Sequence, residues 1–296
     1  MTSALPAPGP MNEEQRAAVS RYLQTGDTET SDTFLWPGNN FVDKETNAHT
    51  ALRQALIDEV QRRAQGAVLP EIPPQRELVQ MTRCRVEPMV RGLFPKAEQD
   101  TILKLLEGSV VFLTTANINR VLEDESFHHC AWMLANAYLT STGAEPLGGS
   151  IQSLLGLSQE TTCYVTAKYL EGRGKFDDFL VHEAAHVFHN YKREFVGLRH
   201  TRTKEWLLPI DFRKRELFAY CCEAYSRIVE QGKSPKDRTA LFEEYVRDPY
   251  KIDGLDVKEH IDILKDAVAT KNGWKRILAR CAPVPPATRS EAGIAT

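Results

Sequence analysis

Residues 179–190 read FLVHEAAHVFHN, and this stretch decides how the chain is interpreted. It contains no glycine or proline, and its polar residues are bracketed by uncharged side chains. The pattern predicts a buried helix with a polar stripe, and a buried polar stripe needs a chemical reason. We expect the helix to begin after Asp177, whose carboxylate can accept backbone N–H bonds, and to continue through Tyr191.

The polar stripe has the spacing of a metal site. His182 and His186 are four residues apart, so they lie on one helix face about one turn from each other. Two imidazoles placed in this way can bind a single zinc ion, and Glu183 projects from the adjoining side, where it can accept a proton from a water. Zinc lowers the pKa of such a water to about 7, so the set predicts hydrolysis of a carbonyl compound. The alternative interpretation is a pair of core histidines beside a solvent-facing Glu183.

A catalytic zinc site also needs a third protein ligand and one open position. Glu216, Tyr220 and Glu223 lie in a helix predicted over residues 211–230, at spacings that place all three on one face. Enough chain separates His186 from Glu216 for this helix to turn back against the first. On the residues alone, both Glu216 and Glu223 stay open as the third ligand.

The run ELFAYCCE at residues 216–223, taken with His182-Glu183 and His186, resembles the gluzincin metallopeptidases. In that family a helix bearing HExxH is followed by a second helix that donates a glutamate, and the run here is closer to the lethal-factor-type branch than to thermolysin. The resemblance covers roughly fifty residues. It implies a zincin-like fold with His182, His186 and Glu216 as zinc ligands and Glu183 as the general base. It also implies that Glu223 orients a ligand histidine.

Further residues are candidates for the pocket around the metal. His189 lies on roughly the face of His182 but almost two turns along, so we interpret it as a pocket-wall residue or as one that orients a ligand. A hydrogen-bond donor to the transition state could be His200, Tyr220 or Tyr225, and the sequence does not choose among them. A third histidine ligand is disfavoured, because the Gly-bearing turn of HExxHxxGxxH is missing.

The rest of the chain predicts an α+β protein that is mostly helical. Apolar spacing predicts helices over residues 13–23, 48–63, 97–106, 127–139 and 257–279, the last interrupted at Asn272-Gly273, and a helix over 76–93 that Pro88 should break. Residues 110–114 and 161–169 predict short strands, which gives a small sheet before the HExxH helix. The second strand is either an edge that pairs with an extended substrate or an ordinary core strand.

Composition suggests how the chain is organised. Its uncharged, proline-containing start predicts a disordered arm over residues 1–10, and a similar end predicts a disordered tail over 282–296. Between them we expect a predominantly helical N-terminal region over 11–95, which could be a separate lobe, and a zincin-like catalytic domain over 96–281.

Charge and cysteine usage exclude several classes of function. The 296 residues carry a net charge of -3, so no global field favours nucleic acid or an anionic membrane. The cysteines show no CxxC spacing, Met1–Pro10 lacks the features of a secretory signal, and no stretch has the length and composition of a bilayer span. We therefore expect a cytoplasmic protein that binds neither membranes nor nucleic acid, although export by a non-classical route stays open.

These observations predict a zinc metallopeptidase that cleaves a protein or peptide. Two alternatives stay open, which are a zinc hydrolase of a non-peptide amide and a non-catalytic zincin-fold module that binds a partner. Glu183 argues against the module, because a purely structural site needs no base. The sequence does not determine the substrate, the cleavage specificity, the oligomeric state or the role of the N-terminal region.

Overall fold

The computed structural model describes residues 10–67, 72–148, 156–159, 161–170, 174–201, 204–251 and 254–283. Contacts divide the chain into two compact units: unit 1 comprises residues 1–79 and 109–172, and unit 2 comprises residues 80–108 and 173–296. This division does not test whether residues 11–95 and 96–281 fold as separate domains, so those boundaries stay predictions. The expected disordered arm and tail lie outside the described residues, except for Pro10, Ala282 and Pro283.

Unit 1 is built mainly from helices. They are α1 (Glu13–Thr25), α2 (Phe41–Ala64), α5 (Ile118–Asp124) and α6 (His128–Ser141), with a 3-10 turn, η1 (Thr30–Leu35). α1 begins in a capping box, in which Asn12 and Gln15 each accept a backbone N–H from the other, and it ends at Gly26 with a φ of 76°. A core that includes Tyr22, Leu56 and Leu122 joins these helices.

A three-stranded sheet completes unit 1. β1 (Val110–Phe112) pairs in parallel with β3 (Thr162–Val165), and β2 (Gly156–Gln159) pairs with β3 in the antiparallel direction. The chain then continues as a 3-10 turn, η2 (Ala167–Leu170). Because the strand order is β1-β3-β2, β3 is the middle strand. The interpretation of residues 161–169 as a substrate-binding edge is therefore wrong, since both sides of β3 are already paired.

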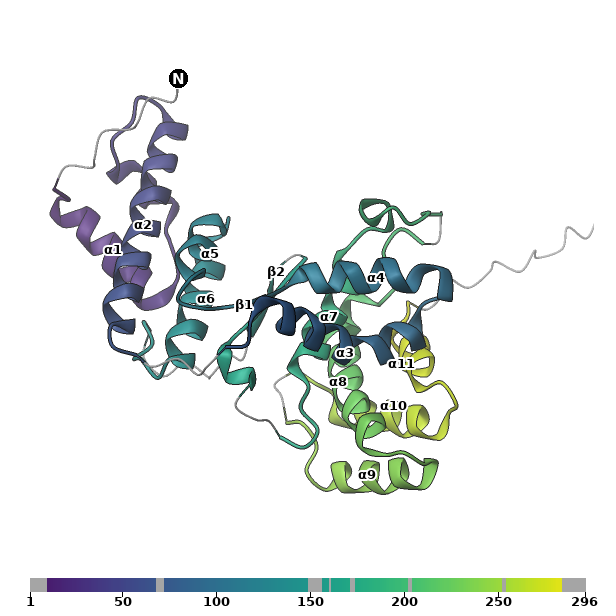
Figure 1. Ribbon diagram of the computed structural model, residues 1–296. Coiled ribbons are helices and arrows are strands. Elements are labelled where there is room, and N and C mark those ends of the chain that lie inside the picture. Colours follow the sequence, from purple (N-terminus) through teal and green to yellow (C-terminus); the bar gives the residue numbers. More distant parts are fainter. Residues whose placement is uncertain are drawn as a thin grey trace, which may run out of the picture. The chain divides into compact units, whose positions relative to one another are not determined.

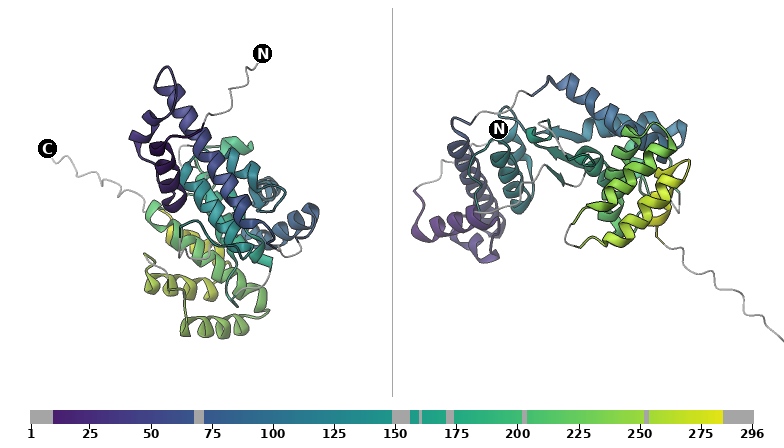
Figure 2. Two further views of the ribbon diagram at one scale, coloured as in Figure 1. Left: turned by 90° about the vertical axis from the view of Figure 1, so that its left-hand side faces the viewer. Right: turned by 90° about the horizontal axis from the view of Figure 1, so that it is seen from below.

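Unit 2 is helical, and α8 (Arg215–Gln231) is its central element (Figures 1 and 2). It packs against α7 (Phe179–Asn190), α9 (Pro235–Arg247), α10 (Val257–Ala269) and α11 (Gly273–Cys281). α3 (Gln75–Leu93) and α4 (Lys96–Ser109) contribute most of their length to the same unit, and 3-10 turns η3 (Arg193–Val196) and η4 (Phe212–Lys214) lie between α7 and α8.

The helices of unit 2 confirm some expected boundaries and correct others. α10 and α11 are separate, and the side chain of Asn272 accepts the backbone N–H of Lys275 at the start of α11, as the interruption at Asn272-Gly273 predicts. Pro88 does not break α3, which continues to Leu93. Val86 and Met89, on either side of Pro88, are fully buried, and this packing offsets the lost backbone hydrogen bond.

A buried polar network fixes α8 against α9 and α10. The Nε2 atom of His260 lies 2.8 Å from the Tyr245 hydroxyl, and its Nδ1 atom lies 3.4 Å from the Cys221 sulfur. Burial lowers the pKa of His260 to about 4, so the ring is neutral at physiological pH. With both ring nitrogens in contact with a polar partner, the histidine can stay in the core.

None of the helices that the structure describes has the length and apolar character of a bilayer crossing.

Gly92 lets α3 and α11 approach closely. A Cβ atom at Gly92 would lie 2.1 Å from Cδ1 and 2.5 Å from Cγ of Trp274, so the indole would have to move. We expect Gly92→Ala to lower the free energy of unfolding by about 1–3 kcal/mol, the usual effect of overpacking, as measured by urea denaturation.

The matched control is Gly108→Ala in α4, where a new Cβ would meet nothing within 4 Å. This change should be neutral or stabilise by up to about 1 kcal/mol, since alanine is the better helix former. Equal stability of the two variants would contradict the close contact between Gly92 and Trp274.

Candidate metal centre

The HExxH sequence lies on α7, whose start differs by one residue from the expected one. Asp178, not Asp177, is the N-cap residue, and its carbonyl accepts the backbone N–H of His182 at 3.0 Å. Asp177 instead closes a turn, because its carboxylate accepts the N–H of Gly174 at 3.1 Å. Every residue from Leu180 to His189 is buried, so the predicted buried polar stripe is confirmed.

Two histidines and one glutamate converge at the contact between α7 and α8. The Nε2 atoms of His182 and His186 are 3.2 Å apart. Glu216 reaches them from the first turn of α8, with Oε2 3.7 Å from His182 Nε2 and Oε1 3.5 Å from His186 Nε2. One ligand atom from each side chain lies within 4.8 Å of the others, so the three residues could hold a metal ion.

The separations allow the three side chains to share one metal ion. Bond lengths of about 2.0–2.2 Å to nitrogen and oxygen at tetrahedral angles place neighbouring ligand atoms about 3.3 Å apart. The 3.2 Å between the two histidine nitrogens is close to this value, and each nitrogen lies 3.5–3.7 Å from a different oxygen of Glu216. Burial, together with the neighbouring His182, His189 and Arg215, lowers the pKa of His186 to about 2. Its ring is therefore neutral, which is the form of histidine that binds a metal ion.

The charge around the histidines also favours a cation. Burial lowers the pKa of His182, but the hydrogen bond and charge of Glu223, followed by the charges of Glu183 and Glu216, raise it overall above the ordinary value. Glu183 and Glu223 are only 6% and 5% exposed. Burying carboxylates costs free energy, and a divalent ion beside them would lower that cost.

Glu223 and Glu216 contact opposite nitrogens of His182. Glu223 Oε2 lies 3.2 Å from His182 Nδ1, and Glu223 Oε1 accepts the backbone N–H of Asp178 at 2.8 Å. A metal-binding histidine usually donates its second N–H to such a carboxylate, which fixes the ring orientation. This geometry favours Glu216 as the ligand and Glu223 as the residue that orients His182.

His189 occupies a similar position beside the second histidine. Its Nε2 atom lies 3.5 Å from His186 Nδ1, and the two rings meet edge to face. Burial, and then the charge of Arg215, lowers the pKa of His189 to about 3, which keeps the ring neutral. Of the roles expected for His189, the structure favours contact with a ligand histidine.

Tyr220 is the candidate donor that the structure brings to the histidines. Its ring centroid lies 4.3 Å from that of His182. Burial, and then the charges of Glu216, Glu223 and Glu183, raises the pKa of Tyr220 to about 12. The phenol therefore keeps its proton at neutral pH and can donate a hydrogen bond.

The other two candidate donors lie elsewhere. Tyr225 is nine residues after Glu216, half a turn away around α8 at about 100° per residue. Its ring packs against Trp274 at a centroid distance of 4.9 Å. His200 is exposed on the connection between α7 and α8, with Nδ1 3.8 Å from a carboxylate oxygen of Glu194. We call His182, His186 and Glu216 together the metal group. The structure gives no support to a role for Tyr225 or His200 at this group.

Arg215 is a site residue that sequence reasoning missed. Its charge contributes to the low pKa of both His186 and His189, after the larger effect of burial. It also lies over the ring of Phe212 at 4.8 Å. The signal in the sequence was its place directly before Glu216.

Comparisons with known protein families, with curated proteins and with solved structures find no match to this chain. The resemblance to gluzincins therefore depends on the motif residues alone, and the function has to be argued from the site.

Purified protein should bind about one zinc ion per chain, because the site has one set of converging ligands. His182→Ala and His186→Ala should both lose the metal, as measured by elemental analysis after dialysis. Zinc at a hundredfold excess over its Kd should stabilise the wild type by about 2.7 kcal/mol and leave the variants unchanged. Retention of the metal by both variants would contradict the ligand assignment.

The two glutamates should differ in their effect on zinc affinity. Glu223→Ala should weaken binding by about 10–100-fold, which is typical of a residue that orients a ligand, and Glu216→Ala should weaken it further. Competition with a chromogenic chelator measures both, and Glu243→Ala, at an exposed position of α9, is the control. The reverse order would assign the ligand role to Glu223.

Proposed function

We propose that this chain is a zinc-dependent hydrolase, and specifically a metallopeptidase, with zinc held by His182, His186 and Glu216. One observation carries the proposal: the Nε2 atoms of both histidines and the carboxylate of Glu216 meet within 3.2–3.7 Å beside a further carboxylate, Glu183. Three nitrogen and oxygen ligands with one open position are the usual protein contribution to catalytic zinc. The order of the two helices, HExxH helix first and glutamate helix second, is the basis for proposing a zincin-like fold.

Two imidazoles and a carboxylate can also hold iron, as in non-haem oxygenases. Glu183 distinguishes the zinc hydrolase from the iron oxygenase. It follows His182 directly on α7, it is buried, and its charge acts on both His182 and Tyr220. Hydrolysis needs a base at that place, whereas oxygen activation by iron does not.

Each side chain of the group has a role in the proposed reaction. When bound, zinc supplies a Lewis acid that polarises a carbonyl and lowers the pKa of a water to about 7. Glu183 accepts the proton of the attacking water and returns it to the leaving amine. Tyr220, which stays protonated, donates a hydrogen bond to the carbonyl oxygen as negative charge develops there.

One side of the metal group is accessible. The side chains of His182 and His186 are 6% and 11% exposed, whereas that of Glu216 is 67% exposed. The group is therefore buried on the side of α7 and open on the side of Glu216, where a peptide segment can approach. An open side of this kind is compatible with a protein or peptide substrate, and the preference for a peptide over a small amide depends on the resemblance of the motif. A cytoplasmic location is part of the proposal and depends only on the sequence features described above.

Glu183→Gln should keep zinc and the fold but lower the rate of peptide cleavage by at least ~100-fold, because the base is lost while the metal ligands stay. The measurement compares zinc-loaded wild type and variant on an unbiased peptide library read by mass spectrometry. Glu243→Gln, at an exposed position of α9, is the control and should cleave like the wild type.

Equal cleavage by wild type and Glu183→Gln would remove Glu183 from the mechanism. A wild type that binds zinc but cleaves no library peptide, while it hydrolyses small acyl-amide substrates, would favour the second class of hydrolase.

A further inference from the structure

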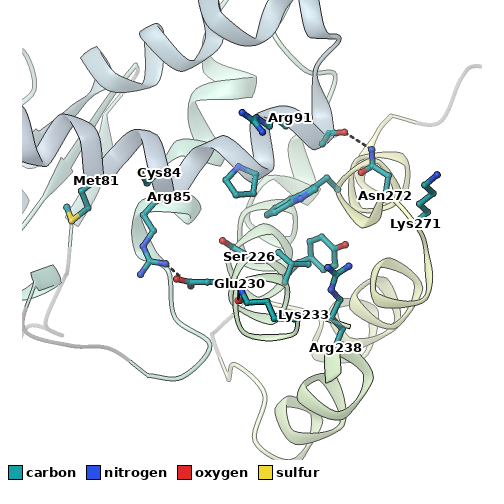
Figure 3. Close-up of a pocket in the computed structure, with 15 residues that line it drawn as sticks. Met81, Cys84, Arg85, Arg91, Ser226, Glu230, Lys233, Arg238, Lys271 and Asn272 are labelled. Atoms are coloured by element: carbon teal, nitrogen blue, oxygen red, sulfur yellow. Dashed lines mark hydrogen bonds and ion pairs between the residues drawn. The ribbon is translucent and has the colours of Figure 1, made fainter. Parts of the chain in front are cut away.

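A second cleft lies in unit 2, between α3 and the helices α8 and α11 (Figure 3). Its volume is about 920 Å³, which is within the range of small-molecule sites. Contacts hold both of its ends. At one end Arg85 of α3 pairs with Glu230 of α8 at 2.7 Å, and at the other Asn272 donates to the carbonyl of Gly92 at 3.0 Å.

The lining of this cleft is strongly basic. It holds five cationic side chains and one carboxylate, namely Arg85, Arg91, Lys233, Arg238, Lys271 and Glu230. Arg85 and Arg227 both pair with Glu230, so its charge is already balanced. Lys233, Arg238 and Lys271 have no carboxylate partner in the described part of the chain. Positive charge without an acidic partner in a concave site attracts an anion.

Arg238 brings one of these charges to the cleft from α9. Its Nε atom donates to the Gly232 carbonyl at 2.9 Å, which fixes the side chain of this α9 residue (Figure 3). Burial raises the pKa of Tyr225, and the positive charge of Arg238 opposes that effect, so the guanidinium acts on the phenol. Arg238 lines the cleft, and the hydrogen bond to the Gly232 carbonyl uses only its Nε–H.

The walls between the charges are apolar. Met81 and Pro88 of α3 face Val229 of α8, and Trp274 of α11 lies against Gly92. The ring of Tyr225 meets that of Trp274 edge to face. A bare inorganic anion would leave these surfaces and most of the volume without a partner, whereas a ligand with an apolar body would cover them.

This cleft is distinct from the metal group. At about 100° per residue, Tyr225 and Val229 lie roughly opposite Glu216 around α8, while Tyr220 and Glu223 lie beside it. The two sites therefore use different residues of the same helix. Ser226 and Glu230 of the cleft lie on the side of Glu216 but two or more turns further along, and Arg85 also pairs with Asp178, the N-cap of α7, at 3.7 Å. Their functions can be tested separately.

We propose that the cleft binds an amphipathic organic anion, a molecule with an apolar body and a carboxylate or phosphate group held by Lys233, Arg238 and Lys271. The excess of positive side chains in the lining predicts that the ligand is negatively charged. The apolar walls and the volume indicate that it is larger than a free inorganic ion. The ligand need not be a substrate of the metal group.

Cys84 provides a direct readout, because it is an exposed thiol on the wall of the cleft, whereas Cys163, Cys221, Cys222 and Cys281 are buried. The probes are 1-naphthyl phosphate and 1-naphthoate, and the neutral 1-naphthalenemethanol has the same ring system without the charge. Zinc-loaded full-length protein is alkylated with iodoacetamide, and mass spectrometry follows the rate at Cys84. At least one of the two anions should slow alkylation, and the alcohol should not. The more protective anion identifies the head group.

The double variant Lys233→Gln/Lys271→Gln should weaken this protection by about tenfold, because two of the positive charges that line the cleft are lost. The matched control is Lys236→Gln/Lys275→Gln, which removes two exposed lysine charges from α9 and α11 outside the cleft and should protect like the wild type. Thermal unfolding checks that both variants fold. Lack of protection by both anions, equal protection by the alcohol, or equal loss in both double variants would overturn the proposal.

Discussion

The carboxylate of Glu223 is the interaction on which the metal group depends. It is buried between α7 and α8, where it accepts the N–H of Asp178 at the start of α7 and contacts Nδ1 of His182 one turn later. A single side chain of α8 thereby fixes both the first turn of α7 and the orientation of one imidazole. The opposite nitrogen of His182 is left facing His186 and Glu216, so the position of the candidate ligands follows from the packing of two helices.

α8 serves different purposes along its length. Its N-terminal half carries Glu216, Tyr220 and Glu223 toward α7, and its C-terminal half, from Tyr225 onward, forms part of the basic cleft. Buried Cys221 contacts His260, which in turn contacts Tyr245. The neutral histidine ties α8 to α9 and α10 without adding charge to the core. This network makes the helix a rigid support, which a metal site needs if its ligands are to stay within a few tenths of an ångström of their places.

Local periodicity predicted most of the site, and long-range packing accounts for what it missed. The convergence of His182 and His186 follows from a spacing of four residues, which any α-helix turns into proximity. The sequence could not decide between Glu216 and Glu223 as the third ligand, because that choice depends on how α8 is rotated about its axis against α7. The edge assignment of the strand over 161–169 failed for the same reason, since strand order depends on partners distant in sequence. Helical geometry alone could have excluded Tyr225, which lies half a turn from Glu216.

The electrostatics of the site explain why this arrangement is costly to build for any purpose other than binding a cation. An apolar contact between α7 and α8 would be at least as stable as one that buries Glu183 and Glu223 beside two imidazoles. Glu223 is partly compensated by its hydrogen bonds to the Asp178 N–H and to His182. The negative charge of Glu223, Glu183 and Glu216 raises the pKa of His182. A divalent ion between His182, His186 and Glu216 would lie next to the same carboxylates, so the charge that raises the pKa of His182 would contribute to the affinity for the ion.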